Sequence, residues 1–125
     1  MYKLLFVGSG VDTFAKMINA LQADDRVVFS QAGSGKDALG ELQKEPVHLV
    51  VAEEQLPDMS GLAFAEKLVV QNPMVNCALV SSLDADDFHE ASEGLGILAK
   101  LPPEPDEAQA EDLLQKLESI LGPAR

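Results

Sequence analysis

The 125-residue sequence is poor in cysteine and in basic residues, and it lacks any long apolar segment. A single cysteine, Cys77, excludes an internal disulfide and a cysteine-based metal cluster, and its apolar neighbours predict a small buried side chain. No apolar run approaches the roughly 20 residues that span a bilayer, and the apolar start at residues 1–7 is too short for a signal peptide. We therefore expect a cytoplasmic protein without a membrane segment.

Lysine and arginine are scarce relative to aspartate and glutamate. Nine basic residues stand against 21 acidic ones, and the formal net charge is -12. Residues 84–125 carry 11 acids and 3 bases, whereas residues 1–83 carry 10 and 6. Because binding to a nucleic-acid backbone relies on clustered Lys and Arg, this balance argues against nucleic acid and favours a protein partner with a basic face. A solvated acidic surface without a binding role is the simpler alternative.

Short apolar runs alternate with segments of helical periodicity along the whole chain, whose length suits one domain over residues 1–125. Five runs predict strands, at 4–7, 27–29, 49–52, 78–80 and 97–99. The segments between and after them predict five helices, near 14–21, 34–44, 60–71, 84–93 and 113–121. Asp12 or Thr13 is placed to cap the first helix. The last helix is expected to bury Leu113, Leu114, Leu117, Ile120 and Leu121.

Strands that are apolar throughout, each followed by a helix, are typical of a parallel sheet covered on both faces, since every parallel connection needs a crossover. Five such units predict a doubly wound α/β domain. In folds of this class, ligands bind beyond the carboxyl ends of the strands. That edge gathers Gly8, Ser9, Gly10, Ser30, residues 53–61, Ser81, Ser82 and Lys100.

The most informative segment is residues 49–61, where an apolar strand ends in Glu53 and a Pro57-Asp58-Met59-Ser60-Gly61 turn leads into a helix. It resembles the phosphorylation-site segment of two-component receiver domains, in which the phosphate-accepting aspartate lies four residues before this proline. Glu53 holds that position. Glutamate keeps the charge, but its extra methylene moves the carboxylate by about 1.5 Å. Phosphoryl transfer depends on positioning, so we expect this displacement to be costly.

The resemblance covers nearly the whole chain and implies a flavodoxin-like sheet with strand order 2-1-3-4-5 and five helices. A receiver's first strand usually ends in an acidic pair that helps to hold Mg²⁺, and the matching residues here are Gly8 and Ser9. Because only Glu53 and the Gln55 carbonyl remain as ligands, we expect no metal site and no cofactor. The rim of the altered site is completed by Glu54, Gln55, Pro57, Asp58 and Ser82.

Two receiver switch positions are retained at strand ends, Ser81 and Lys100. In the family the hydroxyl bonds a phosphoryl oxygen and the lysine neutralises its charge; here Lys100 is free to pair with Glu53 instead. Ile97 takes the place of the aromatic switch residue. Taken singly, these residues have plainer interpretations, with Ser81 and Ser82 as turn residues and Glu53 as a carboxylate exposed to water.

The resemblance implies a signalling domain of a bacterial two-component phosphorelay and not an enzyme, and the altered site implies a degenerate receiver that binds proteins without phosphorylation. Expected partners are a sensor kinase, an output domain or another regulator. They would contact the face of the fourth helix, fifth strand and fifth helix, which could also form a homodimer. One alternative is an active receiver that accepts phosphate at Glu53, Glu54 or Asp58. Another is a small-anion or nucleotide binder built on the Gly8-Ser9-Gly10 loop.

Overall fold

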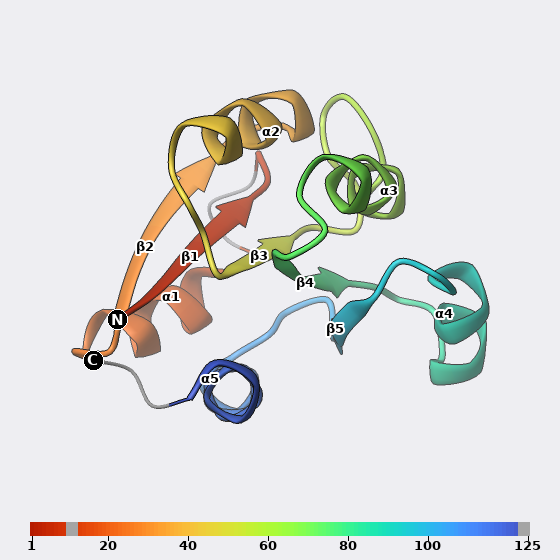
Figure 1. The fold of residues 1–125 in the computed structure, drawn as a ribbon. Helices are drawn as coiled ribbons and strands as arrows, with labels where there is room; N and C mark the ends of the chain where they lie inside the picture. Colours follow the sequence, from red (N-terminus) through yellow and green to blue (C-terminus); the bar gives the residue numbers. More distant parts are fainter. Residues whose placement is uncertain (10–12, 123–125) are drawn as a thin grey trace.

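The computed structural model describes residues 1–9 and 13–122, and within these ranges strands and helices alternate along the chain. Figure 1 shows a central sheet with α1 and α5 on one side and α2 and α3 on the other. Helix α4 lies at the right of the view, past the side of the sheet that β4 and β5 form. The strands are β1 (Tyr2–Val7), β2 (Val27–Ala32), β3 (Leu49–Ala52), β4 (Asn76–Val80) and β5 (Ile97–Leu101). The helices are α1 (Ala15–Gln22), α2 (Gly35–Lys44), α3 (Gly61–Gln71), α4 (Ala85–Ala91) and α5 (Glu107–Leu121).

The sheet is parallel and its strands lie in the order β2-β1-β3-β4-β5. This confirms the predicted doubly wound, flavodoxin-like α/β fold. The chain turns from β2 back across β1 to β3, so β1 and β3 are neighbours with Val7 opposite Ala52. The residues that follow these two strands therefore meet at the carboxyl edge, where folds of this class bind ligands.

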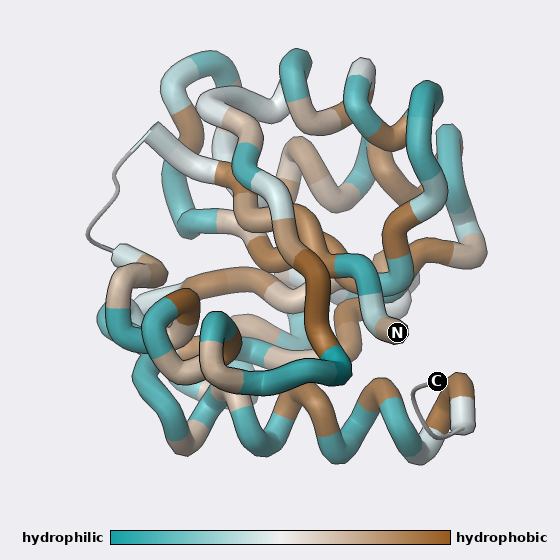
Figure 2. The backbone as a smooth tube through the Cα atoms, turned by 90° about the vertical axis from the view of Figure 1, so that its left-hand side faces the viewer, coloured by the Kyte–Doolittle hydropathy of each residue, from teal (hydrophilic) through white to brown (hydrophobic). Residues whose placement is uncertain are grey.

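Two apolar cores, one on each face of the sheet, account for the continuous apolar strands. Along β1, Leu4 and Phe6 pack with α1 and α5, whereas Leu5 and Val7 pack with α2 and α3. Successive side chains of a strand point to opposite faces, so a strand buried on both faces is apolar at every position. In Figure 2 the hydrophobic colour accordingly follows the inner strands, and the hydrophilic colour recurs along the outer turns of the helices.

Cys77 is buried as predicted, and desolvation raises the pKa of its thiol to about 12.

The structure corrects two expectations about helix ends. Thr13 does not cap α1: the N-cap is Phe14, which makes no side-chain capping bond within the described residues, and its buried ring packs 5.2 Å from that of Phe6. Asp12 lies outside the described residues. At the end of α5, Ile120 and Leu121 are 54% and 45% exposed. The core that α5 joins reaches no further along this helix than Leu117, so the last turn lies past the packed region.

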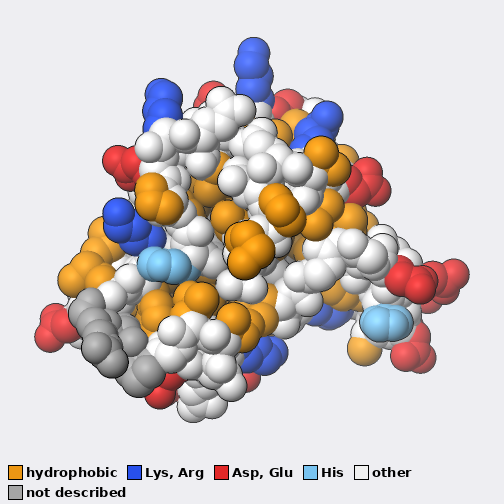
Figure 3. Space-filling model, in the orientation of Figure 1, with side chains coloured by type: hydrophobic (Ala, Val, Ile, Leu, Met, Phe, Trp, Pro, Cys, Tyr) orange, Lys and Arg blue, Asp and Glu red, His pale blue; other side chains and the backbone are white. Residues whose placement is uncertain are grey.

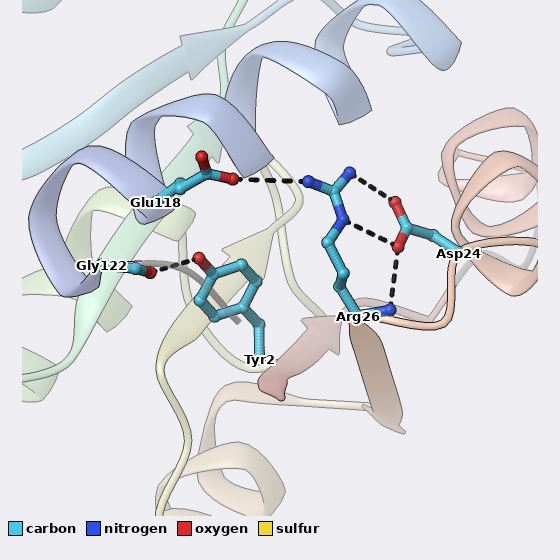
Figure 4. A network of polar contacts seen from close by, with 5 residues as sticks. All are labelled: Tyr2, Asp24, Arg26, Glu118 and Gly122. Carbon is cyan, nitrogen blue, oxygen red and sulfur yellow. Dashed lines mark hydrogen bonds and ion pairs between the residues drawn. The ribbon is translucent and has the colours of Figure 1, made fainter. Parts of the chain in front are cut away.

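Polar contacts fix the edge of the sheet opposite the predicted site (Figure 4). Arg26 binds Asp24 through Nη2 to Oδ2 at 2.7 Å and reaches Glu118 of α5 at 3.5 Å. The hydrogen bond from the Arg26 side chain is the main reason why the pKa of Asp24 lies below its usual value. The Tyr2 hydroxyl donates to the Gly122 carbonyl at 2.6 Å. These contacts attach the end of α5 to the starts of β1 and β2.

None of the helices in the described ranges has the length and apolar character that crossing a bilayer requires.

Candidate functional site

The carboxyl edge of the sheet brings together Gly8, Glu53 and Ser81, which the sequence places at strand ends, whereas Ser30 lies inside β2, which continues to Ala32. The Glu53 amide donates to the Val7 carbonyl at 3.0 Å, and the Gly8 amide donates to the Ala32 carbonyl at 2.9 Å. On the other side of β3, the Ser81 amide donates to the Leu101 carbonyl at 3.0 Å. Residue 53 therefore lies between residue 8 on one side and residue 81 on the other, as predicted from the parallel sheet.

The Glu53 side chain turns inward toward β1. It is only 8% exposed, so the interpretation as a carboxylate in water is wrong. A Cβ atom built on Gly8 would lie 2.3 Å from Glu53 Cδ and 2.5 Å from Oε2, which means that the carboxylate fills the space a side chain at residue 8 would need. Glu53 Oε1 is buried and has no hydrogen-bond partner among the described residues. A buried carboxylate oxygen without a donor is costly, because its lost hydration is not replaced.

The predicted pairing of Lys100 with Glu53 is not formed in the described part of the chain. The direction of the Glu53 side chain gives the reason. Its carboxylate points toward Gly8, after β1, whereas Lys100 on β5 lies on the other side of β3. Lys100 is exposed and lines a groove between α4 and β5.

Glu54 crosses to the start of the segment between β4 and α4. Its Oε2 atom accepts hydrogen bonds from the Ser82 amide at 2.9 Å, from Ser82 Oγ at 3.0 Å and from Ser81 Oγ at 3.5 Å. Ser81 is buried, and its Oγ also accepts from the Leu83 amide at 3.1 Å, which is the turn role expected of a serine here. The structure thus joins three of the predicted rim residues through one carboxylate oxygen.

Asp58 caps a helix that lies more than 20 residues away in the sequence. Its two carboxylate oxygens accept from the amides of Gly35 and Lys36, each at 2.9 Å, at the start of α2. The bond from the Lys36 amide, followed by that from Gly35, holds the pKa of Asp58 below its usual value. The amides at the start of α2 therefore already bind an internal anion.

We expect the Asp58 cap to appear in the pH dependence of stability. Because the pKa of Asp58 is lower in the folded than in the unfolded chain, its ionised form stabilises the fold above the unfolded value of about 3.9, and this contribution is lost as the pH falls through the folded pKa. Urea unfolding of the wild type and of Asp58→Asn between neutral and acidic pH tests this. The wild type should lose more stability on acidification than the variant, and parallel curves would contradict the assignment.

The turn at residues 55–60 is held by local bonds. Gln55 pairs with Ser60 as an isolated antiparallel bridge, the Leu56 amide donates to the Met59 carbonyl at 2.8 Å, and Pro57 lies exposed between them. Ser60 Oγ then accepts from the Ala63 amide at 3.0 Å and caps α3. The Gly61 amide at the start of α3 donates to the Glu54 carbonyl at 2.9 Å, which ties this turn to the residues that follow β3.

The donor set at this edge does not fit Mg²⁺. Gly8 and Ser9 bring no carboxylate, and Glu53 Oε1 is enclosed by protein. No group of three or more Asp, Glu, His or Cys side chains within residues 1–9 and 13–122 is arranged to hold a metal. Mg²⁺ demands a nearly ideal octahedral set of oxygen ligands, which these residues do not provide.

The glycine loop at residues 8–10 gains no support as an anion site. Gly10 lies outside the described residues, and the Gly8 amide is already bonded to Ala32. The helix that follows begins only at Ala15, so Ser9 is not in its first turn. An anion site at a helix N-terminus needs free amides in that turn.

Comparison with known proteins assigns the family. The sequence model described as response regulator receiver domain matches residues 11–102, which is most of the chain. The chain belongs to the response regulator receiver family. No curated protein sequence gives a significant match to it.

Solved structures share the fold of this receiver at low sequence identity. The chemotaxis response regulator CheY4 of Vibrio cholerae is 18% identical over 94% of this chain and 98% of that chain, with a TM-score of 0.80. The signal receiver domain of an HD domain-containing protein from Pseudomonas fluorescens Pf-5 is 22% identical, with 94% and 88% covered and a TM-score of 0.80. A CheY-like receiver domain protein from Methanospirillum hungatei JF-1 is 18% identical, with 95% of each chain covered and a TM-score of 0.82.

A groove of about 480 Å³ lies between α4 and β5 of this receiver. It contains Ile97 and Lys100, the two predicted switch positions on β5, and also Phe88 of α4 and Lys116 of α5. Phe88 and Lys116 were not predicted from the sequence as site residues. The signal available for Phe88 was one large apolar residue within the acidic helix that was expected at 84–93. No local pattern marks Lys116, because its place in the groove depends on how α5 packs.

Proposed function

We propose that this receiver is a degenerate member of its family and acts as a phosphorylation-independent protein-interaction module in a two-component pathway. The inward position of Glu53 carries the proposal. Its carboxylate fills the space beside Gly8, where the family would place an acidic side chain, and no group of metal ligands forms among the residues that the structure describes. Without a metal, charge on a transferring phosphoryl group is poorly neutralised.

The structural roles of the three candidate acceptors support the same proposal. Glu53 is buried, Glu54 is bonded to Ser82, and both oxygens of Asp58 cap α2. A nucleophilic carboxylate must reach the phosphorus atom in line with the leaving group, so each would first have to give up its present position. Acceptor chemistry would therefore require Glu53 to leave its buried position, and Glu54 and Asp58 to break their present hydrogen bonds.

The groove between α4 and β5 is the surface we propose for the partner. Lys100 and Lys116 flank apolar Phe88 and Ile97 within it, and the outer side of α4 carries exposed acids, visible around α4 at the right of Figure 3. A partner with an apolar anchor and basic side chains around it fits this surface. A sensor kinase, an output domain or another cytoplasmic regulator could supply it, and a second copy of the receiver could occupy the same face.

Incubation with acetyl phosphate and Mg²⁺, followed by intact-mass spectrometry, tests the proposal. We expect no stable phosphoryl adduct, because neither the metal nor an in-line acceptor is in place. A receiver with an intact acidic pair and acceptor aspartate, treated in parallel, shows that the donor is competent. An adduct that peptide mapping assigns to Glu53, Glu54 or Asp58 would overturn the proposal in favour of an active receiver.

A further inference from the structure

We propose that Glu54 is an internal latch: its carboxylate holds the β4–α4 loop, residues 81–84, in one arrangement without any phosphoryl group. This inference rests on the proposed function and adds how the interaction face would be kept in place. The geometry that carries it is the convergence of the Ser82 amide and hydroxyl on Glu54 Oε2, at 2.9 and 3.0 Å, with the Ser81 hydroxyl facing the same oxygen at 3.5 Å.

The latch joins two loops that are far apart in sequence. Glu54 follows β3 and Ser82 follows β4, and the bonds at 2.9 and 3.0 Å span 28 positions of the chain. An ionised carboxylate forms shorter and stronger hydrogen bonds than a neutral acceptor, and one oxygen that accepts a backbone amide fixes the main chain as well as the side chain. The Ser81 hydroxyl, which the family resemblance would assign to a phosphoryl oxygen, is already turned toward this carboxylate.

The loop controls where α4 begins. Only two residues after Ser82, Asp84 is the N-cap of α4 and accepts from the Asp87 amide at 2.8 Å. All seven residues of α4 are described, and Phe88 alone among them is buried. A helix that is anchored by one buried side chain depends on the segments at its ends for its position. Fixing Ser82 therefore fixes the start of the helix that forms one wall of the groove between α4 and β5.

Hydrogen exchange of Glu54→Gln tests the latch. Glutamine keeps the length of the side chain but removes the charge and presents an NH₂ group to donors. We expect amides of residues 82–84 and of α4 to exchange at least about 10-fold faster than in the wild type, since hydrogen bonds to charged groups are the stronger ones. Ser82→Ala, which keeps the amide bond and loses the hydroxyl bond, should have a smaller effect in the same direction.

Glu53→Gln is the matched control, because it neutralises the neighbouring carboxylate, which makes no bond to this loop within the described residues. Its exchange at residues 82–84 should stay at the wild-type rate. Urea unfolding verifies that both proteins are folded. Equal exchange rates at residues 82–84 in Glu54→Gln and in the wild type would then overturn the latch, even if the receiver is never phosphorylated. Phosphorylation of a wild type that shows the latch would instead overturn the proposed function alone, so the two failures are distinguishable.

Discussion

Gly61→Ala is expected to lower the free energy of unfolding by about 1–3 kcal/mol, the usual cost of forcing an extra group into a packed site. A Cβ atom at this position would lie 2.5 Å from the backbone carbonyl oxygen of Glu53 and 3.4 Å from that of Glu54. The Gly61 amide also donates to the Glu54 carbonyl at 2.9 Å, so the turn cannot open without losing this bond. The clash is with backbone atoms, which cannot be relieved by a change of side-chain rotamer.

Gly40→Ala is the control for this substitution. Gly40 lies within α2, and no described atom outside its own neighbourhood lies within 4 Å of the Cβ position. Alanine there should raise the free energy of unfolding by about 0.5–1 kcal/mol, because glycine loses more backbone freedom in a helix. Urea unfolding at constant m-value measures both changes. A Gly61→Ala protein as stable as the wild type would show that the turn is not packed as described.

The second large effect is the gain of a metal site in the triple variant Gly8→Asp, Ser9→Asp and Glu53→Asp. The shorter aspartate at residue 53 withdraws the carboxylate from the space beside residue 8, and the two new acids supply the missing oxygen ligands. We expect saturable Mg²⁺ binding, visible as a thermal stabilisation that reaches about 2.7 kcal/mol when the metal is present at 100 times its dissociation constant.

The double variant Gly8→Asp and Ser9→Asp isolates the role of Glu53. The long side chain still occupies the space beside residue 8, where a Cβ would meet Glu53 Cδ at 2.3 Å. This variant should be less stable than the triple variant and should respond to Mg²⁺ weakly or not at all. A folded triple variant that ignores Mg²⁺ would contradict the match of residues 8, 9 and 53 to the receiver metal site.

Apolar runs such as 49–52, which can be buried only between two layers of helices, located the five strands, whereas the strand order came from the resemblance to receiver domains. The direction of the Glu53 side chain followed from neither. A strand-end glutamate can point outward or inward. The inward position has room because residue 8 is a glycine, and only the pairing of β1 with β3 brings Gly8, 45 positions earlier in the chain, beside Glu53. Glu54 and Asp58 were recognised as rim residues, yet their partners Ser82 and Gly35 lie 28 and 23 positions away. Contacts at that separation are set by the tertiary fold, which local patterns do not specify.

Titration of the unmodified receiver with Mg²⁺, followed by amide chemical shifts, shows whether the carboxyl edge of the sheet binds a metal. We expect that the amides of Gly8, Glu53 and Glu54 do not shift in a saturable way, because the Glu53 carboxylate is turned inward and the described residues around it form no group of metal ligands. Saturable shifts centred on these three amides would contradict it, since they would show that a divalent cation is bound at this edge.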